Sequence, residues 1–127
     1  MIRIDLMSRK PIYDQLVDRI SQLIIAGVYP ACSQLPSVRS LSCQLSVNPN
    51  TIQKAYTHLC NAGITYSVAG KGCFVSPNAK EVLGQGARGQ LPRLGEFLNK
   101  LLDSGIDPEE LTDYIQRVMD ERRENRD

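Results

Sequence analysis

Apolar residues recur every three or four positions in the first quarter of the chain, between Ile12 and Ile24. This spacing places them on one face of a helix. Pro11 precedes the pattern and suits the first position of a helix, because its missing N–H would have no partner there. We therefore predict a first helix that begins at Pro11 and stops before Gly27 and Pro30.

Two shorter helical patterns follow, separated by a tight turn. Ser37 is a good N-cap for the first, which ends near Ser46. Asn48 caps the second, and Pro49 stands at its first position. Gly63 is placed to end this second helix in a left-handed conformation. The apolar positions predicted to be buried are Val38, Leu41 and Leu45 in the first helix and Ile52, Ala55, Tyr56, Leu59 and Cys60 in the second.

Two short runs of β-branched and aromatic residues come next, at 64–68 and 73–75. The sequence AGKG between them contains two glycines and is typical of a hairpin tip. Three helices followed by a two-stranded hairpin predict a winged helix-turn-helix. The predicted fold class is therefore mainly α with a small β-hairpin, and residues 1–76 form its first domain.

Residues 77–127 differ in character, and three glycines fall between Gly84 and Gly89. This stretch is either a linker or a poorly stable helix. Two amphipathic helical patterns follow, with a turn near Gly105 and a capping residue at Asp107. We predict a linker followed by a C-terminal two-helix hairpin.

Composition narrows the class of protein. The chain has 127 residues, of which 42% are apolar and 23% charged, and this suits one modest core with a small annex. The sequence lacks an apolar run of the roughly 18 residues that a membrane span needs. Its start also lacks the apolar core of a signal peptide. We therefore expect a soluble, cytoplasmic protein.

Four cysteines are far apart in the sequence, and His58 is the only histidine. Structural zinc sites draw on closer spacings, so we interpret the cysteines as reduced thiols. The sequence also offers no plausible pair of nucleophile and base. We expect no metal, no cofactor and no enzymatic activity. The four thiols belong to Cys32, Cys43, Cys60 and Cys73.

Charge is distributed unevenly along the chain. Residues 1–76 carry seven Lys or Arg against three Asp or Glu, whereas residues 77–127 carry eight against eleven. No acidic residue occurs between Asp18 and Glu81. An acid-free stretch of this length fits contact with a polyanion, although few basic residues fill it.

Short polar side chains occupy the first turn of the helix that Asn48 caps. In a helix-turn-helix, the second helix enters the major groove of DNA with its N-terminal end. Gln and Asn can pair with adenine there, Thr can contact a thymine methyl, and Lys suits phosphate or guanine. The alternative is a solvated helix face. We predict DNA contacts for Asn50, Thr51, Gln53 and Lys54.

Two further positions complete the predicted surface. Arg39 lies in the first turn of the preceding helix and faces outward, where Arg can pair bidentately with guanine. At the hairpin tip, Lys71 stands between Gly70 and Gly72, which let the backbone approach closely. A cation there is favoured in the minor groove. The alternatives are an unengaged surface arginine and a chance Gly-Lys-Gly sequence.

The motifs LPSVRSL, VNPNTIQKAY and GKGCFV resemble, in this order and spacing, the winged helix-turn-helix of GntR-family bacterial transcription regulators. PIYDQL at the start of the first helix supports the resemblance, which covers about Lys10 to Ser76. The short two-helix tail is similar to that of the YtrA subfamily. The resemblance implies a base contact by Arg39, polar contacts from the recognition helix, and a wing contact by Gly70 and Lys71.

The resemblance also implies a homodimer bound to a palindromic operator, usually as a repressor, and an association with ABC transporter genes. We expect each tail helix to pair with its twofold mate, because two isolated helices bury too little surface to fold alone. An unknown small-molecule effector could tilt these helices, although the sequence identifies no pocket for one. A winged helix that binds a partner protein is the alternative function. The predicted dimer interface consists of Leu94, Phe97, Leu98, Leu101, Ile115 and Val118.

The sequence departs from the family pattern in two places. Ala31 and Cys32 stand where the family usually has glycine followed by an acidic or polar residue, so we expect the turn before Leu35 to differ. His58 stands where many relatives have an acidic residue. Two interpretations of this side chain stay open, an exposed histidine and a phosphate contact.

Overall fold

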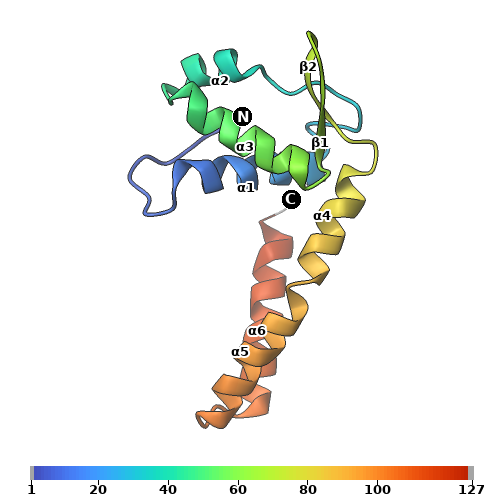
Figure 1. Ribbon diagram of the computed structural model, residues 1–127. Coiled ribbons are helices and arrows are strands. Elements are labelled where there is room, and N and C mark those ends of the chain that lie inside the picture. Colours follow the sequence, from blue (N-terminus) through green and yellow to red (C-terminus); the bar gives the residue numbers. More distant parts are fainter. Residues whose placement is uncertain (1, 126–127) are drawn as a thin grey trace. The chain divides into compact units, whose positions relative to one another are not determined.

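The computed structural model describes residues 2–125, and the chain divides into two compact units, one ending at Ala87 and one beginning at Arg88. Figure 1 labels the elements along the chain. The mainly helical fold with one small hairpin is the predicted class, and it is confirmed. In order, the elements are α1 (Ile12–Ile25), α2 (Val38–Leu45), α3 (Pro49–Asn61), β1 (Thr65–Val68), β2 (Gly72–Val75), α4 (Ala79–Arg88), α5 (Leu91–Asp103) and α6 (Pro108–Glu124).

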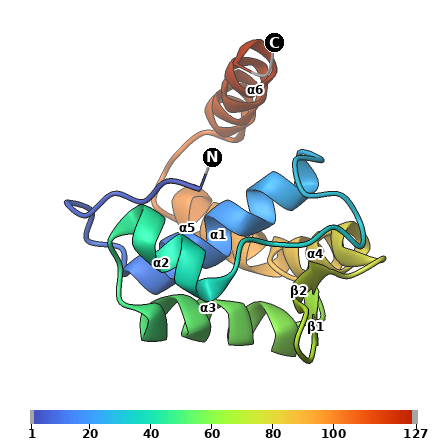
Figure 2. The same cartoon turned by 90° about the horizontal axis from the view of Figure 1, so that it is seen from above.

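Helix α3 contacts two other helices and a strand of the first unit. It packs against α1, α2 and β1, and its C-terminal end meets the hairpin (Figure 2). The buried faces of these elements form one apolar core. Because α3 is held on several sides, its exposed face keeps a fixed orientation. The most completely buried side chains of this core are Leu16, Ile20, Ile24, Leu41, Ile52, Leu59 and Val75.

The helix starts follow from their capping residues. The Ser40 N–H donates to Ser37 Oγ at 3.0 Å, and the Asn50 N–H donates to Asn48 Oδ1 at 2.8 Å. These bonds satisfy N–H groups that have no partner inside the helix, so both predicted caps are confirmed. Pro11 occupies the cap position of α1 rather than its first helical position, so that prediction is wrong by one residue.

The segment that joins α1 to α2 bonds to the hairpin without forming a strand of its own. β1 and β2 pair antiparallel, and Gln34 makes an isolated bridge to Phe74 on the other edge of β2. The Cys32 N–H donates to the Val75 carbonyl at 2.8 Å, and the Leu35 N–H donates to the Cys73 carbonyl at 2.9 Å. This pairing was not predicted, and it ties the wing to the start of α2.

The turn before this segment places Cys32 in a backbone conformation that favours glycine. Its φ is +66°. A residue with a Cβ carries a steric cost of about 1 kcal/mol or more in this left-handed region. The hydrogen bond from Cys32 to Val75 nevertheless keeps the segment paired with β2.

The glycine-rich stretch forms a continuous helix, α4, which passes through Gly84 and Gly86 and ends at Arg88. The choice left open between a linker and a helix is thereby decided. Ala79 is buried, and Val82 and Leu83 pack against the core, so burial stabilises a helix that glycine disfavours. The first compact unit accordingly continues to Ala87, beyond residue 76.

The second unit consists mainly of two amphipathic helices. Gly105, with φ +102°, lies in the predicted turn between α5 and α6, and Asp107 caps α6 by accepting from the Glu109 N–H at 3.2 Å. None of the helices within residues 2–125 is both long and apolar enough to cross a membrane.

We predict that Tyr56→Phe destabilises the first unit by about 1–2 kcal/mol. The Tyr56 hydroxyl donates to the Pro36 carbonyl at 2.6 Å, and the residue is only 4% exposed. The substitution therefore leaves a half-buried carbonyl without its partner. Urea unfolding measures the change, with Tyr13→Phe as the matched control, because no hydrogen bond of the Tyr13 hydroxyl is seen within residues 2–125. Equal stability of Tyr56→Phe and the unmodified chain would contradict the prediction.

The burial of the Tyr56 side chain gives this prediction a pH signature. Burial raises the pKa of Tyr56 above its ordinary value of 10.0. The neutral phenol therefore stabilises the fold fully below pH 10, and this contribution is lost as the pH rises above 10. The alkaline fall in unfolding free energy should be shallower in Tyr56→Phe. A residual fall remains, because burial also raises the pKa of Tyr29 and of Cys73.

Candidate nucleic-acid interface

The first turn of α3 presents polar side chains from a rigid base. Asn48 and Pro49 fix where the helix starts, and the face opposite the polar groups is buried. Of the four side chains of α3 that are predicted to contact DNA, three are exposed and Thr51 is half-buried. The structure therefore places Asn50, Gln53 and Lys54 on an accessible surface, and Thr51 at its edge.

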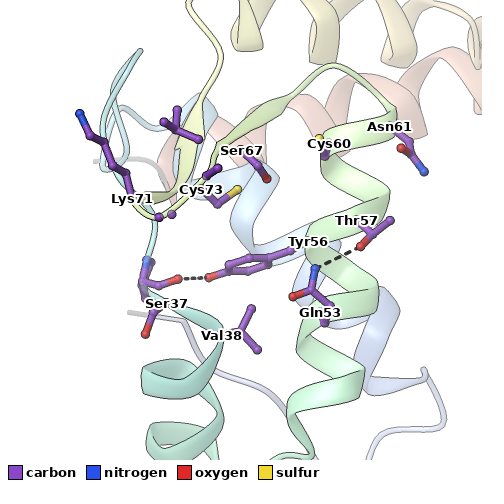
Figure 3. A pocket seen from close by; sticks show the side chains of 15 residues that line it. Ser37, Val38, Gln53, Tyr56, Thr57, Cys60, Asn61, Ser67, Lys71 and Cys73 are labelled. Carbon is purple, nitrogen blue, oxygen red and sulfur yellow. Dashed lines mark hydrogen bonds between the residues drawn. The ribbon is translucent and has the colours of Figure 1, made fainter.

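Gln53 also belongs to a groove between α3 and the wing, with a volume of about 430 Å³. Its Nε2 donates to Thr57 Oγ1 at 3.3 Å, one helical turn away (Figure 3). Lys71 lies on the opposite wall, and its side chain points away from Tyr56. The groove brings together four of the predicted contact residues, Gln53, Gly70, Lys71 and Gly72.

Arg39 is exposed in the first turn of α2. It is outside the lining of the groove, although its neighbours Ser37 and Val38 form part of that lining. Asn50, Thr51 and Lys54 are also outside the lining. The predicted contact residues therefore occupy the groove between α3 and the wing together with the first turn of α2 and the first two turns of α3.

The tip of the wing has a constrained backbone. The Lys71 N–H donates to the Val68 carbonyl at 2.9 Å, and Gly70 and Gly72 have φ values of +75° and +120°. Gln34 Nε2 donates to the Lys71 carbonyl at 2.8 Å. Sequence reasoning missed Gln34, because its partner is 37 positions away and no local pattern announces the contact.

The surface formed by α2, α3 and the hairpin carries cations without carboxylates. Arg39, Lys54 and Lys71 are exposed, and the nearest acidic residues along the sequence are Asp18 and Glu81. No carboxylate from this stretch of chain can therefore repel the phosphates of DNA. The absence of acidic residues makes a small number of cations sufficient for a favourable interaction.

All four cysteines are free thiols. Cys60 and Cys73 line the groove, and burial raises the pKa of Cys73 above its ordinary value, which keeps this thiol protonated. His58 is exposed, and its ring meets the Tyr13 ring edge-on with 5.8 Å between centroids. The side chain is therefore an exposed histidine with one aromatic neighbour. A contact between His58 and a DNA phosphate stays a prediction.

Helices α5 and α6 expose an apolar face. Of the predicted interface residues, Leu94, Phe97 and Val118 are 50%, 58% and 44% exposed. The other three, Leu98, Leu101 and Ile115, are half-buried. The prediction omitted four large apolar side chains that are also exposed, namely Leu91, Leu102, Tyr114 and Met119.

Comparison with known protein families shows which family the chain belongs to. The model of the bacterial regulatory proteins of the gntR family matches residues 12–75, which include α1, α2, α3 and the hairpin. The chain belongs to the GntR family. It is also 34% identical over 122 residues to the HTH-type transcriptional repressor YtrA of Bacillus subtilis, covering 93% of this chain and 92% of that protein.

Solved structures of similar proteins agree with this assignment. A transcriptional regulator from Oenococcus oeni has a TM-score of 0.72 and 32% identity, covering 91% of this chain and 97% of that one. The DNA-binding domain of AraR, solved in complex with operator ORX1, has a TM-score of 0.53 and 33% identity, covering 58% of this chain and 92% of that one. This GntR protein is a DNA-binding transcriptional regulator and not an enzyme.

We predict that Gly72→Ala destabilises the wing by about 1–2 kcal/mol. A Cβ at this position would lie 2.9 Å from Gln34 Nε2, and the φ of +120° is strained for any residue with a Cβ. Thermal unfolding measures the change. Gly86→Ala is the matched control, since it lies in α4 with open space around it and should stabilise the fold by about 0.5–1 kcal/mol. A Gly72→Ala variant as stable as Gly86→Ala would refute the prediction.

Proposed function

We propose that this chain is a homodimeric repressor that binds a palindromic operator. The observation that supports the proposal most directly is the apolar face of α5 and α6. Of the residues described in these two helices, none is fully buried. Helices of this length are marginal in water unless an apolar face is covered, so the tail requires a partner surface.

A second copy of the chain is the simplest partner for this face. The side chains of this face with the highest exposed fractions, 58–60%, belong to Leu91, Phe97 and Tyr114. Burying a fully exposed large apolar side chain contributes about 1.5–3 kcal/mol, and these side chains, already partly covered, should contribute roughly half of that each. The α5–α6 hairpin also has a cavity of about 420 Å³ lined by Leu101, Leu111 and Tyr114 among others, into which apolar side chains of a second copy can pack.

A twofold dimer presents two recognition helices in inverted orientation. The operator that suits such a pair consists of two inverted half-sites, whose spacing follows from the dimer geometry. In each half-site, we assign base contacts to Arg39 and to the first turn of α3, and a minor-groove contact to Lys71. The positions of these residues on one acid-free surface support the assignment.

Repression is the regulatory sign that the relatives favour. The similar Bacillus subtilis protein YtrA is named a transcriptional repressor, and NagR of the same organism, 30% identical over 114 residues, carries the same description. Control of ABC transporter genes is proposed from family resemblance alone. An effector that alters the pairing of α5 and α6 would change the spacing between the recognition helices.

We predict that Arg39→Ala weakens binding to the selected operator by about 1–3 kcal/mol and relaxes base preference at one position of each half-site. Lys71→Ala should instead weaken binding to all sequences similarly and reduce the salt slope by about 1. Fluorescence anisotropy at several salt concentrations measures both effects. Lys80→Ala, an exposed cation on α4, is the control and should change little. Unchanged specificity in Arg39→Ala would remove this residue from the site.

We predict that Phe97→Glu converts the dimer into a monomer at micromolar concentration. A buried carboxylate without a partner at an apolar interface should weaken association by at least about 2 kcal/mol. Light scattering measures the mass, and circular dichroism checks that the helices persist. Asn99→Glu, on the same helix but at an exposed polar position, should remain dimeric. A monomeric unmodified chain would refute the dimer directly.

A further inference from the structure

Gln34 joins the segment before α2 to the tip of the wing. Its side chain is exposed, and its Nε2 donates to the Lys71 carbonyl at 2.8 Å. Lys71 is the residue that the proposed function places in the minor groove. The contact therefore links a residue outside the predicted DNA surface to one that belongs to it.

The backbone on both sides of Gln34 is fixed, so its side chain leaves from a defined point. The Val75 N–H donates to the Ser33 carbonyl at 2.8 Å, and the Leu35 N–H donates to the Cys73 carbonyl at 2.9 Å. Gln34 itself forms the bridge to Phe74. A side chain anchored in this way can restrain the group to which it bonds.

Gly72 leaves room for the restraint. A Cβ at Gly72 would stand 2.9 Å from Gln34 Nε2, so the amide lies directly over the glycine. Glycine therefore serves this position in two ways. It adopts a φ of +120°, and it leaves space for the Gln34 side chain. The amide reaches the Lys71 carbonyl because no side chain intervenes.

The restraint acts on an element that has little stability of its own. Outside β1 and β2, the wing consists of a short turn, and an isolated two-stranded hairpin is marginal in water. The Lys71 N–H is held by Val68 within the turn, whereas its carbonyl is held by Gln34 from outside it. Of these two bonds, the second reaches from Lys71 to the segment that leads into α2, whereas the backbone bonds of that segment hold β2 at Cys73 and Val75.

We infer that Gln34 is a positioning residue for the wing, which holds the Lys71 backbone in place relative to α2 and α3 for contact with DNA. The inference rests on the proposed contact between Lys71 and DNA. Restraining the tip before binding reduces the conformational entropy lost when the lysine engages the groove. Gln34 requires no contact with DNA for this effect.

The test compares Gln34→Met, Lys71→Ala and the double variant in operator binding by the full chain. Methionine has a similar length and lacks the amide donor. We expect Gln34→Met alone to weaken binding roughly three- to tenfold, the range for one lost hydrogen bond. In the Lys71→Ala background the same substitution should have almost no effect, because the group it positions is gone. Gln44→Met is the matched control, an exposed glutamine on α2.

Two readouts separate positioning from a general loss of stability. Gln34→Met should flatten the salt dependence of affinity, as Lys71→Ala does, by no more than one phosphate contact. The amide resonances of Lys71 and Gly72 should shift in the free variant, while thermal unfolding keeps a midpoint close to that of Gln44→Met.

Each remaining outcome has a defined meaning. An equal loss of affinity from Gln34→Met with and without Lys71 overturns the inference, because the effect would not pass through the lysine. A normal affinity in Gln34→Met, while Lys71→Ala weakens binding, overturns the inference and leaves the proposed function intact. A normal affinity in Lys71→Ala overturns the wing contact itself, and the positioning role with it.

Discussion

The hydrogen bond from the Tyr56 hydroxyl to the Pro36 carbonyl, at 2.6 Å, joins the recognition helix to the segment on which the rest of the surface depends. Toward the N-terminus, this segment pairs with β2 and bonds the wing tip through Gln34. On the other side it begins α2 at the Ser37 cap and so places Arg39. One connection of six residues, 32–37, therefore bonds to α3 and to the wing and leads directly into α2, which adds to the direct packing of α3 on α2 and β1.

The sequence predicted local structure well, because the signals for it are local. Ser37 and Asn48 cap helices by bonding N–H groups two or three residues away, and Gly63, with φ +81°, ends α3 as its position indicated. The pairing of residues 32–35 with β2 was not predictable in this way. That segment has no alternating pattern, and its partners are about 40 positions away in the sequence.

Tertiary packing also decided two features that the local sequence left open. Gly84 and Gly86 disfavour a helix, yet α4 is continuous because Ala79, Val82 and Leu83 pack on the core. In the tail, helical spacing identified α5 and α6 but could not rank exposure within each stripe. Ile115 is half-buried, whereas Tyr114 is 58% exposed. The proposed contact residues occupy the starts of α2 and α3 and the hairpin tip, which sequence signals mark, and their contacts with DNA stay a prediction.

The most direct test of this account is an NMR titration of the full chain with a short duplex of random sequence at low salt. The account predicts that amide shifts concentrate in three segments, 37–40, 48–54 and 69–72, and that they move together in one binding event, since residues 32–37 connect all three. Shifts confined to α5 and α6, or to the face of α1 away from α3, would contradict it. Shifts in α3 without the wing would show that the two are not one surface.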